Sequence, residues 1–397
     1  MRLSAPFPVL FFASAAHAMN HVLLALYLTL VLVMGPTWHL SYAELIALWA
    51  PGAMLVGLGA PLAGWLGDRW GETRVLILCF LGLGGSAVLA GLSQSIYMLE
   101  GALALLGLAG AIYHPVGIPW VVKHARVRGR AIASTGIAGS FGVAGGPVVA
   151  GALATLAGWR VGFVVPGLVT LAIGAALAWF HFTGRVVDRR DDAHVQHAPP
   201  SRADMTRTFA TLGLTMTVGL IINSGFGTAL PKLVEIGTAL GHYGFFAIGL
   251  AVGAIQLLGS SAQFAGGHFA DKGAAKRAYI AGLLASAIAL PLVAVSSGWA
   301  LAAAGVAVIF LFEWTAPIET LFMARYSPQN RRGLVFGIRY GLATIGTPLG
   351  VWLVSRLYSP ADGFFYLLAA LGLFALIGAV AALFLPADKP AETIAAE

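Results

Sequence analysis

Three polar side chains lie close together inside the first apolar stretch of the chain: His17, Asn20 and His21. Spacings of three and four residues place side chains on one face of an α-helix. Imidazole and amide groups on such a face could hydrogen-bond a polar solute, or the histidines could carry protons. These side chains could equally form hydrogen bonds with neighbouring helices. We expect no metal site, because no cysteine or carboxylate lies near them in the sequence.

Further ionisable residues fall within later apolar stretches, namely His114, Glu313 and Arg339. A carboxylic acid in a dry cavity can exchange a proton near neutral pH, so Glu313 is the first candidate for proton coupling, with His21 and His114 after it. Alternatively, Arg339 pairs with Glu313 or Glu319 and fastens two helices together. Both could hold, because a carboxylate that releases Arg339 on protonation would be a two-state switch.

The remaining uncharged polar and aromatic candidates share a position within predicted membrane segments. We expect the cargo to contact all of these residues, and also the histidines, Asn20 and Arg339. Alternatively, the amide side chains serve as hydrogen-bond partners between helices. These candidates are Tyr27, Tyr113, Asn223, Gln256 and Trp314.

The composition identifies the solvent of these residues as lipid. Apolar residues make up 59% of the 397 and charged residues only 10%, whereas soluble domains carry about a quarter charged residues. Segments of about 20 apolar residues can cross a bilayer. Twelve are predicted, over 7–34, 43–66, 75–95, 98–121, 131–156, 161–182, 209–231, 244–265, 278–296, 299–323, 333–357 and 363–385. We expect the first to be retained rather than cleaved as a signal peptide.

The basic residues lie mostly in every second connection between these segments, which by the positive-inside rule places both termini in the cytoplasm. The longest polar stretch, residues 184–208, contains Pro199 and Pro200 and is predicted to be a cytoplasmic linker. It divides the chain into two six-helix bundles, residues 1–183 and 209–397. The fold class is therefore an all-α membrane protein with twelve transmembrane helices and an N-in, C-in topology.

Two pairs of matching segments indicate that the halves are repeats. Gly64-Trp-Leu-Gly-Asp68-Arg69-Trp-Gly71 is echoed by Gly267-His-Phe-Ala-Asp271-Lys272-Gly273, about 200 residues later. Glycine and proline in the fifth segment, at Gly146-Pro147, are echoed by Gly346-Thr-Pro348 in the eleventh. Such self-similarity is typical of transporters built from repeated helical bundles.

These motifs resemble those of the major facilitator superfamily over essentially the whole chain. The resemblance implies the fold of that superfamily and a conformational gate formed by Gly64, Asp68, Arg69 and Gly71, with Asp271 and Lys272 in the second copy. Gly146-Pro147 is similar to the fifth-helix motif of exporters and is added to that gate. Two further segments, Ala16-His-Ala-Met-Asn-His21 and Tyr113-His-Pro115, resemble the fosmidomycin-resistance branch, with His21 replacing an acidic residue.

The sequence therefore predicts a secondary transporter that works by alternating access, with proton-coupled export of a small organic solute as the leading hypothesis. The alternatives are uptake of an anionic metabolite, histidine-mediated metal uptake, or a non-transporting receptor on the same scaffold. No nucleophile–base set or phosphate loop predicts an enzyme or a cofactor. We expect small-molecule cargo, protons and the lipid bilayer as partners, no nucleic acid, a monomer, and multi-pass insertion in the inner (plasma) membrane.

Overall fold

The computed structural model describes residues 5–125, 128–188, 202–262, 274–326 and 332–387, with the backbone alone for 128–129, 324–325, 332–340 and 343–344. The described backbone is helical, and its one β-bridge joins Ser359 to Gly363. The second Asp-containing loop, with Asp271 and Lys272, lies outside the described residues. Of Arg339 only the backbone position is described, within a helix.

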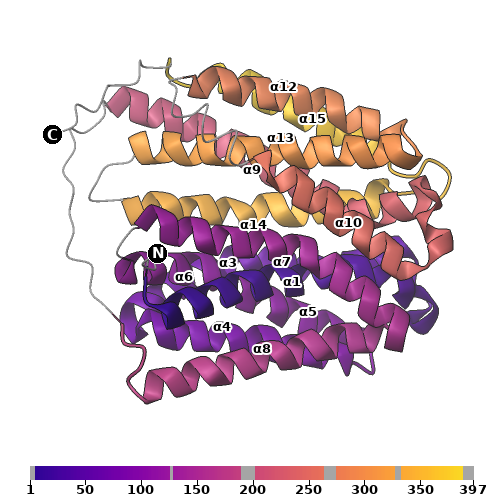
Figure 1. Cartoon of the computed structure of the whole chain (residues 1–397). Coiled ribbons are helices and arrows are strands. Elements are labelled where there is room, and N and C mark those ends of the chain that lie inside the picture. Colours follow the sequence, from indigo (N-terminus) through magenta and orange to yellow (C-terminus); the bar gives the residue numbers. More distant parts are fainter. Residues whose placement is uncertain (1–4, 126–127, 189–201, 263–273, 327–331, 388–397) are drawn as a thin grey trace.

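The helices of the first half form one bundle and those of the second half form another, side by side with their axes roughly aligned (Figure 1). The first half consists of α1 (Phe7–Trp38), α2 (Tyr42–Ala47), α3 (Ala50–Trp70), α4 (Glu72–Gly91), α5 (Ile96–Gly110), α6 (Tyr113–His124), α7 (Arg128–Ala157) and α8 (Trp159–Phe182). The second consists of α9 (Arg202–Gly237), the 3-10 turn η1 (Ala239–Tyr243), α10 (Phe245–Ser260), α12 (Ala275–Ala294), α13 (Gly298–Tyr326), α14 (Arg332–Leu357) and α15 (Phe365–Ala382).

Ten helical segments of the described chain are long and apolar enough to cross a membrane, and α10 is a shorter apolar helix. Over the described residues, each predicted segment coincides with helical backbone, although two segments contain a break. One boundary differs clearly, because α9 begins at Arg202, inside the stretch expected to be linker. Asp204 lies in the first turn of α9, where its carboxylate interacts favourably with the positive end of the helix dipole. This interaction helps to explain why the helix begins early.

The fourth predicted segment is divided into α5 and α6 at residues 111–112. Pro115 explains the break, because its ring lacks an N–H and clashes with the carbonyl four residues earlier, at Ala111. The last turn of α5 closes instead with a tighter bond from the Ile112 N–H to the Ala109 carbonyl, 3.2 Å long. Tyr113 and His114 therefore occupy the start of α6, directly after a discontinuity in a membrane segment.

Glycines on α7 allow this helix to touch the backbone of α1. A methyl group added at Gly142 would overlap the Ala18 carbonyl oxygen, and one added at Gly146 would lie 2.7 Å from the Ala25 Cβ. Small residues at such spacing let membrane helices approach closely and gain dispersion contacts. This contact fixes the distance and rotation of α1 relative to α7.

The same stretch of α7 meets the second half. Methyl groups added at Gly249 and Gly253 of α10 would overlap the carbonyl oxygens of Pro147 and Ala144. Away from this contact, the Tyr42 hydroxyl donates to the Thr228 carbonyl at 3.2 Å, which joins α2 to α9. The Gly146-Pro147 motif thus lies where α1, α7 and α10 meet.

We predict that Gly142→Ala lowers the free energy of unfolding by about 1–3 kcal/mol, because its Cβ meets backbone atoms of Ala18 that cannot rotate away. The matched control is Gly136→Ala on the same helix, where an added methyl group meets nothing within 4 Å. Apparent melting temperatures in detergent would check this. Equal shifts in the two variants would contradict close α1–α7 packing.

Candidate functional site

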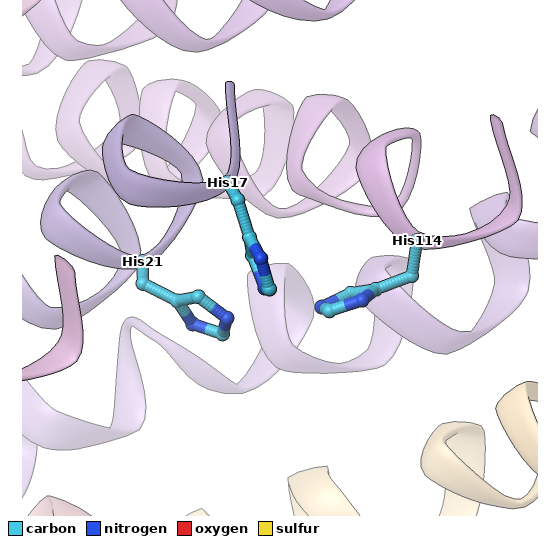
Figure 2. Close-up of side chains that lie close together, drawn as sticks. All are labelled: His17, His21 and His114. Atoms are coloured by element: carbon cyan, nitrogen blue, oxygen red, sulfur yellow. The ribbon is translucent and has the colours of Figure 1, made fainter. Parts of the chain in front are cut away.

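Three histidine side chains converge in the first half, two from α1 and one from the start of α6. Figure 2 shows His17, His21 and His114 pointing toward one another. One ring nitrogen of each lies within 4.8 Å of the others, and the ring centroids of His17 and His21 are 4.9 Å apart. All three side chains are half-buried. The structure therefore brings together residues that lie almost 100 positions apart in the sequence.

His17 is held by contacts with two further helices. Its Nδ1 lies 2.8 Å from the Thr135 carbonyl oxygen of α7, and its ring stacks on Tyr113 with centroids 4.4 Å apart. A carbonyl only accepts, so Nδ1 carries the hydrogen in this bond. Gly139 makes room for the ring, since an added methyl group there would lie 2.5 Å from the His17 Cε1. Thr135 and Gly139 were not identified from the sequence.

Asn20 does not share the surface of the histidines. It is 1% exposed, its Oδ1 faces Gly110 of α5, and this oxygen has no hydrogen-bond partner among the described residues. Tyr27 is also fully buried, and its hydroxyl donates to the Leu45 carbonyl of α2. In this conformation both side chains contact protein rather than an open space.

The candidates of the second half that the structure describes with side chains lie on α9, α10 and α13. Asn223 is exposed on α9, and Gln256 is half-buried on α10. Trp314 donates its indole N–H to the Ala278 carbonyl of α12 at 3.0 Å. Glu313 is half-buried on α13, and on the same helix Glu319 accepts a 2.7 Å hydrogen bond from Tyr279.

The connection between α3 and α4 is the single residue Gly71, and it is anchored by residues that sequence analysis missed. Gly71 has a φ of 91°, a conformation that glycine adopts without strain. Asp188, from the segment after α8, accepts hydrogen bonds from the Thr73 N–H and hydroxyl at 3.1 and 2.5 Å. Its carboxylate therefore caps the start of α4, where the helix dipole favours negative charge.

The remaining members of the first loop signature lie near that anchor. Gly64 of α3 faces Pro115 of α6. A methyl group added at Gly64 would lie 3.7 Å from the Pro115 Cβ. Asp68 and Arg69 are exposed, and the Arg69 guanidinium lies 5.5 Å from the centroid of the Trp65 ring. The signature thus combines close helix packing beside the histidines with charged residues at the helix end.

A groove between α9 and α15 is separate from the histidine cluster. Its lining is apolar apart from one threonine, so it suits hydrocarbon chains rather than a polar solute. The lining residues are Ala210, Thr211, Leu214, Leu376, Ile377, Val380, Ala381 and Phe384.

The family of the chain follows from comparison with known proteins. The model of the Major Facilitator Superfamily matches residues 10–274 and 212–397. The chain belongs to this superfamily. Members of this superfamily are transporters rather than enzymes, which agrees with the class expected from the sequence. The placement of the chain in the fosmidomycin-resistance branch stays a prediction.

Individual relatives are more distant. The chain is 33% identical over 146 residues to a probable 4-methylmuconolactone transporter of Cupriavidus pinatubonensis, covering 34% of each chain. It is 35% identical over 116 residues to a multidrug efflux pump of Mycolicibacterium smegmatis, covering 28% of this chain and 22% of the relative. The matched segments thus span about a third or less of these relatives.

A solved structure shows the fold over nearly the full length. A bacterial homolog of the human lysosomal transporter Spinster, in an inward-facing and occupied conformation, superimposes with a TM-score of 0.73. The superposition covers 97% of this chain and 95% of that one, at 14% sequence identity. The arrangement of helices is therefore that of a solved transporter.

We predict that Gly139→Ala displaces the His17 ring and costs about 0.5–1.5 kcal/mol, the net worth of the lost hydrogen bond to Thr135. In a His17→Ala background the same substitution should cost nothing, because the obstructing ring is gone. A double-mutant cycle measured by thermal unfolding isolates this coupling. The higher helix propensity of alanine contributes equally in both backgrounds and therefore cancels. Additive effects would show that His17 does not lie over Gly139.

Proposed function

We propose that the protein is a proton-coupled exporter of a small organic solute, built from twelve membrane-spanning helices with both termini in the cytoplasm. The observation that carries the proposal is the polar cluster of His17, His21 and His114 at a broken membrane helix. Polar residues inside a membrane are costly and usually mark a transport path. Discontinuous helices commonly form substrate sites in secondary transporters.

The cargo site would begin on the first half and be completed by the second. His21 and His114 present ring nitrogens that can bind a polar group, while Tyr113 stacks on the His17 ring. Asn223 and Gln256 would add amides from α9 and α10 when the halves rock. Trp314 would offer its ring face, since its N–H is engaged by Ala278.

Asn20, Tyr27 and Arg339 remain proposed cargo contacts, and Asn20 and Tyr27 would need another conformation of the protein to reach the cargo. Asn20 has the strongest support, because its unpartnered buried oxygen costs free energy that a partner would recover. Tyr27 has the weakest, because its hydroxyl is already bonded to Leu45.

Proton coupling would rest on Glu313. It lies within the membrane-spanning helix α13, and that helix contacts α14, which carries Arg339. A carboxylate at this position can pair with a cation when charged and separate when protonated. Such a change alters the relative stability of two packings of the halves, which is what coupling requires.

Two gates would control access from the two sides. Pro147 and Gly146 lie at the contact of α7 with α1 and α10, and Tyr42 reaches from α2 to α9. At the end of the bundle where α1 begins, Asp68 and Arg69 would latch the halves together, with Asp271 and Lys272 in the second copy. The export direction is supported by the relative named as an efflux pump.

Uptake of an anionic metabolite is a second candidate. Among the described residues the three-histidine group contains no carboxylate, so its charge could only become positive. Under this alternative Arg339→Ala would abolish binding of anions, whereas under the exporter proposal binding of neutral or cationic solutes would persist.

The test uses purified protein in liposomes that enclose a pH-sensitive dye. Solutes from a panel of weak acids, organic cations and antibiotics are added one at a time, and proton movement is recorded. We expect at least one solute to drive proton movement in the opposite direction to its own. Solute movement with no proton movement would remove the coupling, and proton movement alongside an entering anion would favour the uptake mechanism.

For a solute that gives a signal, we predict that Glu313→Gln abolishes proton-driven transport but leaves solute exchange across the membrane intact, because the amide cannot release a proton. The control is Glu100→Gln at the start of α5, which should leave both activities unchanged. Loss of exchange in Glu313→Gln would indicate a structural role, and intact proton-driven transport would exclude Glu313 as the carrier.

A further inference from the structure

We propose that His17, His21 and His114 form a binding site for one divalent transition-metal ion of the zinc, nickel or copper type. Their ring nitrogens lie within 4.8 Å of one another, and Figure 2 shows the three rings converging on a shared space. Imidazole nitrogens are ligands that these metals prefer. The site lies entirely within the first half, so metal binding can be measured whether or not the transport proposal holds.

The hydrogen bond of His17 prepares it as a ligand. Because Nδ1 donates to the Thr135 carbonyl at 2.8 Å, the neutral ring carries its free lone pair on Nε2. Histidines that bind metals usually donate their other ring nitrogen to a carbonyl or carboxylate in this way, which fixes both tautomer and ring orientation. Stacking on Tyr113 restrains the ring further.

The third ligand comes from the helix break. His17 and His21, one turn apart on α1, would form only a two-ligand pair. The break before α6 brings His114 to the same place, with its ring centroid 5.2 Å from that of His17 and 5.6 Å from that of His21. Three histidines with an open fourth position are a known arrangement for zinc in proteins.

Small side-chain rotations would complete the geometry. A tetrahedral zinc ion with bonds of about 2.0–2.1 Å holds its ligand nitrogens about 3.4 Å apart, so the rings must close from their present separation of up to 4.8 Å. The three rings already converge, and none of the three histidines is fully enclosed by its neighbours.

Charge determines what the open position would hold. The three imidazole ligands are neutral and so do not balance the divalent charge of the ion, and charge inside a membrane is costly. An anionic fourth ligand, such as hydroxide or a carboxylate oxygen of the cargo, would lower that cost. The metal would therefore give the site a preference for solutes that carry an anionic oxygen.

The experiment measures zinc binding directly. Purified full-length protein in detergent, with any affinity tag removed, is equilibrated with Zn²⁺ alone, and bound metal is quantified by mass spectrometry. We expect about one ion per chain, and at least a tenfold loss of affinity in each of His21→Ala and His114→Ala, because each variant removes a ligand. Co²⁺ in place of zinc should give the visible absorption of four-coordinate cobalt.

The matched control is His242→Ala, which removes an exposed histidine of η1 and should bind zinc like the wild type. Melting temperatures without metal show whether each variant is folded, and Asn replacements at positions 21 and 114 serve if the alanine variants are not. Absence of zinc binding by the wild type overturns the proposal. Unchanged binding in the position 21 and 114 variants also overturns it, because the metal would then lie at other histidines.

Discussion

The close contact between α1 and α7 is the constraint on which the candidate site depends. Gly142 and Gly146 let α7 approach the α1 backbone, and Gly139 leaves room for one imidazole ring. Because membrane helices gain no hydrophobic free energy from association in lipid, dispersion contacts of this kind supply much of their attraction. Any larger side chain on this stripe would both separate the helices and displace His17 from Thr135.

The position of α1 on α7 also decides which of its polar residues reach the shared space. Successive residues of an α-helix are rotated by about 100°, so Asn20 and His21 point about 100° apart with His17 between them. Once His17 is fixed over Gly139, His21 turns toward α6 and Asn20 turns toward Gly110 of α5. One packing contact thus decides that His17 and His21 face the shared space while Asn20 packs against α5.

The sequence predicted what depends on hydropathy and local chemistry. Apolar length located the helices, and helical spacing paired His17 with His21. It could not show that His114 completes a cluster or that Asp188 caps α4 through Thr73, because both contacts join residues far apart in the chain. The i, i+3, i+4 pattern also grouped Asn20 with the histidines, since spacing gives relative angles but not how a helix is rotated against its neighbours.

The two kinds of chemistry in the protein lie on different halves, and this separation bears on the mechanism. The imidazole cluster belongs to α1 and α6, whereas Glu313 belongs to α13. In the proposed mechanism, coupling passes through the relative position of the halves, which meet where α7 packs on α10 and where α14 packs on α3. A proton would then favour one packing of the halves, and cargo at the histidines would favour the other, without the two ever needing to touch.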